Sequence, residues 1–71
     1  MNKKAYIINL KFGIWENQLW LEADDDEKTL ARWEDVKSGL DNVAISCHTS
    51  GEYFTKATEY FADNGFYRIQ K

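Results

Sequence analysis

An alternating pattern of side chains near the N-terminus constrains the fold of this 71-residue chain most strongly. Apolar residues recur at every second position in two neighbouring stretches, Tyr6, Ile8, Leu10, Phe12 and Ile14 in the first and Leu19, Leu21 and Ala23 in the second. A period of two is typical of a β-strand, because successive side chains point to opposite faces. The pattern predicts a long hairpin with strands over Lys4–Trp15 and Gln18–Ala23 and a turn at Glu16 and Asn17.

A helix is expected directly after this hairpin. Its apolar face is a series at spacings of three and four residues, namely Leu30, Trp33, Val36 and Leu40. Asp24 is a suitable N-cap, since its carboxylate can accept a hydrogen bond from the first turn, and Glu27 completes a pattern like a capping box. Gly39 stands where a helix commonly ends. These signals predict a helix over Asp25–Ser38.

The last third of the chain predicts a strand, a second helix and a final strand. Alternating apolar residues indicate a third strand over Asn42–His48. Thr49 and Glu52 form a capping-box pair for a helix that ends at Asn64–Gly65. The apolar side of this helix consists of Phe54, Ala57 and Phe61, widened by Tyr53 and Tyr60. Phe66–Gln70 is then a short last strand.

These elements predict one small α+β domain of order ββαβαβ over residues 1–71. Each helix has one apolar stripe, so both are expected to pack on one face of a four-stranded sheet. The single cysteine, Cys47, excludes an internal disulfide, and a core of this size gives only roughly 3–5 kcal/mol without further support. Association with itself or with another protein is one expected source of support. One cysteine and no targeting pattern predict a reducing cytoplasmic location.

The sheet face away from the helices is predicted to be an interaction surface. Trp15 and Trp20 are its expected centre, and its other residues are Ile7, Asn9, Lys11, Glu22, Ser46 and His48, joined by Tyr67 or Phe66 according to the register. Exposed tryptophan is costly to leave in water, and such patches often mark contacts with other proteins. The face predicts binding of a partner protein or a sheet-to-sheet homodimer.

The distribution of charge predicts a second surface. The net charge is −3, and nine acidic residues lie between positions 16 and 41: Glu16, Glu22, Asp24, Asp25, Asp26, Glu27, Glu34, Asp35 and Asp41. One interpretation is helix capping on a solvated face. The other is an acidic edge, made by Glu22, Asp24, Asp25, Asp26, Glu34 and Asp35, that imitates phosphates on a basic protein. By size and charge it predicts a phage- or mobile-element-type accessory protein that binds and inhibits a host enzyme.

Catalysis, metal binding and a cofactor are not expected. Alternation places Cys47 and His48 on opposite faces of a strand, which separates a nucleophile from its base. The acidic run from Asp24 has Thr29 and Asp35 where a calcium loop needs Gly and Glu. No apolar run is long enough to cross a membrane.

Two alternatives remain open at this point. A nucleic-acid-binding regulator would use the aromatic face with Lys3, Lys4 and Lys11, although a net charge of −3 and the lack of a basic cluster count against phosphate-driven binding. A structural homodimer would have no separate ligand.

Overall fold

The chain begins with a long antiparallel hairpin. The computed structural model describes residues 2–69. Strand β1 covers Lys3–Phe12 and β2 covers Trp15–Asp24, and each residue of β1 pairs with one of β2. Gly13 has a φ of 64° at the first position of the two-residue turn and Ile14 has a negative φ, as in a type II′ turn. The turn expected at Glu16 and Asn17 is therefore wrong, because both residues lie within β2.

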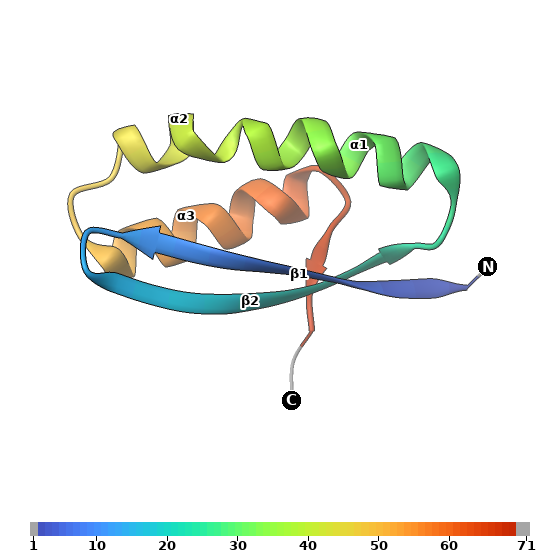
Figure 1. Cartoon of the computed structure of the whole chain (residues 1–71), viewed down its shortest axis with the longest axis horizontal. Helices are drawn as coiled ribbons and strands as arrows, with labels where there is room; N and C mark the ends of the chain where they lie inside the picture. Colours follow the sequence, from blue (N-terminus) through green and yellow to red (C-terminus); the bar gives the residue numbers. More distant parts are fainter. Residues whose placement is uncertain (1, 70–71) are drawn as a thin grey trace.

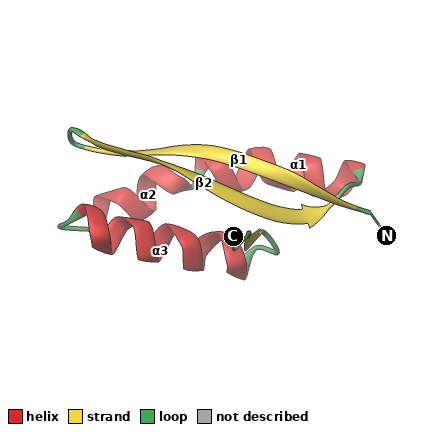
Figure 2. Cartoon of the chain, turned by 90° about the horizontal axis from the view of Figure 1, so that it is seen from below, coloured by secondary structure: helices red, strands yellow, loops and turns green. Residues whose placement is uncertain are grey.

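Three helices lie on one side of this hairpin (Figures 1 and 2). They are α1 (Glu27–Ser38), α2 (Leu40–Ile45) and α3 (Ser50–Asp63). The last strand, β3 (Tyr67–Arg68), pairs antiparallel with β2, so the sheet has the order β1-β2-β3. The fold is a small α+β domain with a three-stranded antiparallel sheet, and residue 70 of the expected last strand lies outside the described residues.

The third strand expected over Asn42–His48 is wrong, because most of this stretch is helix α2. The residues buried or half-buried there recur at helical spacings: Leu40, Val43, Ala44 and Cys47. Ile45, which strand alternation would bury, is 82% exposed. Gly39 keeps a helical φ of −80°, so α2 follows α1 almost directly (Figure 1). Residues 2–69 consequently have the order ββαααβ in place of ββαβαβ.

Helix α1 begins two residues later than expected. Asp26 is its N-cap, and the Asp26 carboxylate accepts a hydrogen bond of 2.7 Å from the Thr29 backbone N–H. This bond lowers the pKa of Asp26. Asp24, the expected cap, is the last residue of β2. Leu30, expected on the buried face, is exposed, and Thr29 is buried instead.

The expected N-cap and end of α3 are confirmed, although the Glu52 carboxylate accepts from the His48 N–H and not from the Thr49 N–H of a full capping box. Thr49 is the N-cap, and its hydroxyl accepts a hydrogen bond of 3.1 Å from the Glu52 N–H. At the other end Gly65 has a φ of 89°, and the Phe66 N–H donates to the Phe61 carbonyl at 2.8 Å. These are the features of a Schellman motif, which closes the helix and turns the chain toward β3.

An aromatic cluster joins the hairpin, α1, α3 and the C-terminal segment. The Trp33 ring of α1 has its centroid 5.1 Å from Tyr6, 5.5 Å from Phe61 and 5.0 Å from Phe66. All four side chains are buried, and Leu10, Leu19 and Leu21 complete the inner face of the sheet. Burial of aromatic rings supplies much of the apolar area that a domain of this size can remove from water.

A close approach at Gly39 holds the α1–α2 junction against α3. The Tyr60 hydroxyl of α3 donates a hydrogen bond of 2.7 Å to the Val36 carbonyl, next to the Cα of Gly39. A Cβ at position 39 would collide with that hydroxyl oxygen. Any other residue there would have to displace the Tyr60 hydroxyl, even though the backbone conformation of Gly39 is open to any residue.

We expect Gly39→Ala to lower the free energy of unfolding by about 1–3 kcal/mol, because the methyl group displaces the Tyr60 hydroxyl from Val36. Gly51→Ala is the matched control, since a Cβ at Gly51 meets no atom within 4 Å. That control should be unchanged or up to about 1 kcal/mol more stable. Urea unfolding measures both, and equal stability of the two variants would contradict this role for Gly39.

Candidate protein-binding surface

The outer face of the sheet carries three large exposed apolar side chains on three different strands. Ile7 of β1 pairs with Trp20 of β2, and Tyr67 of β3 pairs with Glu22, the next outward residue of β2. Ile7 is 45% exposed, Trp20 36% and Tyr67 61%. We call these three residues the outer aromatic patch. Because the helices lie on the other side of the hairpin, none of them covers this patch (Figure 2).

Polar groups hold and border the patch. The Trp20 indole Nε1–H donates to Gln18 Oε1 at 2.9 Å, and the Trp20 carbonyl accepts from the Ile69 N–H at 2.9 Å. At one end of the face Lys3 Nζ lies 2.9 Å from Asp24 Oδ1, and this carboxylate raises the pKa of Lys3. The indole ring is thus oriented from its edge while part of it stays exposed.

Trp15 does not lie on this face, contrary to expectation. It pairs with Phe12 across the turn, and its ring centroid is 6.3 Å from Tyr53 and 6.2 Å from Phe54 of α3. The reason is the position of the turn. Trp15 belongs to β2 and shares the parity of Leu19 and Leu21, so it points toward the helices.

The other expected members of the outer face are placed as follows. Asn9, Lys11 and Glu22 are exposed on the strands, where their parity matches Ile7 and Trp20. Ser46 and His48 are absent from the sheet, because they follow helix α2. Of the two candidates near the C-terminus, Tyr67 is exposed and Phe66 is fully buried.

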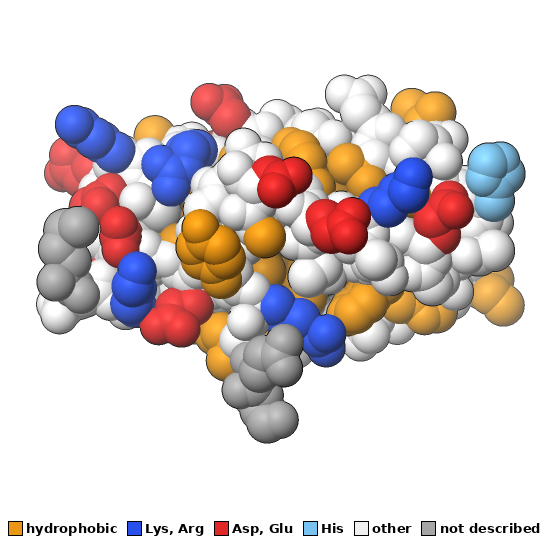
Figure 3. All heavy atoms as spheres, turned by 180° about the vertical axis from the view of Figure 1, so that it is seen from behind, with side chains coloured by type: hydrophobic (Ala, Val, Ile, Leu, Met, Phe, Trp, Pro, Cys, Tyr) orange, Lys and Arg blue, Asp and Glu red, His pale blue; other side chains and the backbone are white. Residues whose placement is uncertain are grey.

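The acidic residues do not form one edge. Glu22 and Asp24 lie on the sheet, Asp25 is exposed in the connection to α1, and the Asp26 side chain is used as a helix cap. The other two, Glu34 and Asp35, are exposed on α1, about 12 Å along the helix axis from the N-cap Asp26. Glu34 forms an ion pair of 3.3 Å with Lys37. Acidic side chains are likewise spread over separate places in Figure 3.

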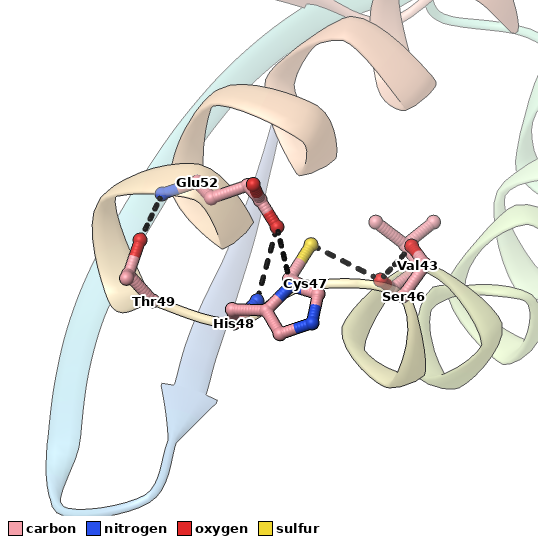
Figure 4. A network of polar contacts seen from close by, with 6 residues as sticks. All are labelled: Val43, Ser46, Cys47, His48, Thr49 and Glu52. Atoms are coloured by element: carbon pink, nitrogen blue, oxygen red, sulfur yellow. Dashed lines mark hydrogen bonds and ion pairs between the residues drawn. The ribbon is translucent and has the colours of Figure 1, made fainter.

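Cys47 and His48 make separate contacts (Figure 4). The Cys47 thiol is buried and donates to the Val43 carbonyl at 3.2 Å. The exposed His48 ring has its Nδ1 3.7 Å from the Glu52 carboxylate, which also accepts from the His48 backbone N–H at 3.0 Å. This network joins the α2–α3 connection to the first turn of α3, so it has a structural explanation.

An open groove of about 530 Å³ lies between α2 and α3. Its lining mixes polar and apolar side chains, with Asn42, Val43 and Ser46 on α2 and its end, and Lys56, Glu59, Tyr60 and Asp63 on α3. Among residues 2–69 no group of three or more His, Cys, Asp or Glu side chains is arranged to hold a metal ion. None of the helices in that range has the length and apolar character needed to cross a membrane.

Comparisons with protein-family models, with curated proteins and with solved structures gave no match to this chain. The interpretation of the surface therefore depends on its own chemistry.

We expect the two surface-proximal tryptophans to differ in their effect on stability. Trp15→Ala removes contacts with Tyr53 and Phe54 and should cost about 2 kcal/mol or more. Trp20→Ala removes the cross-strand pair with Ile7 and the hydrogen bond to Gln18 on a partly exposed face, and should cost about 1 kcal/mol or less. Urea unfolding of both variants measures this, and a larger loss for Trp20→Ala would show that Trp20 belongs to the core.

Proposed function

We propose that this chain is a non-enzymatic protein-binding module whose contact surface is the outer aromatic patch. The observation that carries the proposal is that Ile7, Trp20 and Tyr67 lie together on a sheet face that the helices leave uncovered. Tryptophan and tyrosine give much of the binding energy in protein interfaces, since each buries a large area and keeps a polar group for a hydrogen bond.

The border of the patch supports a partner with basic groups. Glu22 is exposed beside Trp20 and opposite Tyr67, while Asp24 and Asp25 follow toward α1. An apolar centre with an acidic side is complementary to a partner surface that has an apolar pocket next to Lys or Arg. The most concrete form of the proposal is a phage- or mobile-element-type accessory protein that inhibits a host enzyme through such a contact.

Nucleic-acid binding has less support from the same face. Lys3 and Lys11 share the face with Trp20, as a base-stacking surface would need. However, Lys3 is engaged by Asp24, and Lys11 lies directly opposite Glu16 in the register. A phosphate backbone would therefore meet carboxylates together with the lysines.

A pull-down from nuclease-treated lysate tests the proposal. We expect wild-type protein to retain a specific partner and Trp20→Ala to lose it by about tenfold or more, because a central aromatic contact is removed. Ile45→Ala is the matched control: Ile45 is an exposed apolar residue on α2, away from the sheet, and its loss should leave capture unchanged.

Three results of this experiment would contradict the proposal. They are equal capture by wild type and Trp20→Ala, capture of nucleic acid before nuclease treatment with steep loss as salt rises, and recovery of the chain alone. In the third case sedimentation of wild type and Trp20→Ala at several concentrations shows whether the patch joins two copies.

A further inference from the structure

The edge of β1 is a second surface, separate from the sheet face. The strand is ten residues long and stands at the end of the order β1-β2-β3. The opposite end of the sheet is β3, which has only two residues. A long edge strand presents a row of backbone donors and acceptors to any extended chain that approaches it.

The register identifies the backbone groups that point outward. A two-residue turn makes Phe12 and Trp15 a hydrogen-bonded pair, and bonded pairs recur at every second residue. The intervening residues of β1 direct their N–H and C=O groups away from β2; they are Lys3, Ala5, Ile7, Asn9 and Lys11. The partner of Ile7 confirms this alternation, because the Trp20 carbonyl accepts a hydrogen bond from the Ile69 N–H on the side of β2 away from β1.

This edge is accessible. All five of these residues are exposed, and among residues 2–69 no other strand pairs with β1 on that side. Exposed backbone groups in a regular, extended strand are already in the geometry that a further strand requires.

Charge favours one kind of occupant over another. Strand β1 contains Lys3, Lys4 and Lys11 and no acidic residue. Two copies of β1 pairing with each other would bring these lysines side by side, which disfavours self-association along the edge. An extended segment with acidic residues avoids this repulsion between lysines, and its carboxylates would share Lys3 with Asp24 and Lys11 with Glu16, both of which lie on β2.

We infer that β1 is a docking edge that accepts an extended acidic segment of another protein by strand addition, with carboxylates beside Lys3 and Lys11 and an apolar side chain beside Ile7. The inference rests on the proposed protein-binding function and adds to it a second contact and the chemistry of the bound segment. The affinity comes from main-chain hydrogen bonds, and the lysines select the sign of the partner's charge.

A blocked peptide as long as Lys3–Lys11 is the probe, with Glu at both ends, Val at the centre and Thr elsewhere. In antiparallel register its ends face Lys3 and Lys11 and its Val faces Ile7. Amide NMR at up to about 1 mM peptide should show binding, with slowed hydrogen exchange at Ala5, Ile7 and Asn9. The same peptide with Lys in place of Glu should bind with an affinity at least about tenfold lower.

Asn9→Pro tests the role of the backbone. Proline removes an outward N–H that the β1–β2 ladder does not use, so the fold should remain while peptide binding is lost. Asn9→Ala keeps the N–H and should bind as wild type does. If Asn9→Pro unfolds, the peptide N-methylated at its amides that face β1 should fail to bind wild-type protein.

Binding of the Glu peptide to Asn9→Pro, no binding of that peptide to wild type at about 1 mM, or slowed exchange in β1 without peptide as protein concentration rises would each overturn the inference. Trp20→Ala distinguishes the two proposals. It should retain the peptide, because the edge is intact, while losing the partner in the pull-down. If wild-type protein fails to bind the peptide but still captures a partner in the pull-down, the inference about the β1 edge is wrong and the proposed function is not affected.

Discussion

The register of the β1–β2 hairpin is the constraint on which the rest of the structure depends. Gly13 adopts a positive φ that fixes a two-residue turn, and this turn sets the partner of every residue in both strands. A shift by one residue would exchange the two faces of the sheet. The same register that buries Leu10 and Leu21 places Ile7 and Trp20 outside and directs alternate backbone groups of β1 to the free edge.

The aromatic cluster then places the C-terminal segment. Phe66 is buried against Tyr6 and Trp33, and the Schellman motif at Gly65 aims it there from the end of α3. With Phe66 inside, the next residue, Tyr67, must point outward from β3 beside Glu22. Core packing and the composition of the proposed binding face are thus consequences of one chain path (Figure 1).

The sequence allowed the hairpin, α1 and α3 to be predicted, because alternation and capping residues are local signals. The strand predicted over Asn42–His48 is wrong because two patterns overlap there. Val43, Ile45 and Cys47 fit a strand, whereas Leu40, Val43, Ala44 and Cys47 fit a helix. Burial against α3 favoured the helix. The position of Trp15 was missed because Glu16 and Asn17 were preferred to Gly13 as the turn. Of the proposed surface, Ile7, Trp20 and Glu22 were predicted, whereas the contribution of Tyr67 depended on a register that only tertiary packing decides.

Photo-crosslinking tests the central claim most directly, namely that the face bearing Trp20 contacts a protein. A benzophenone amino acid is placed at position 20 in one sample and at position 45, on the exposed side of α2, in another. We predict a discrete crosslinked partner from position 20 and none from position 45. Equal crosslinking from both positions, or none from position 20 in a lysate that crosslinks through position 45, would contradict it.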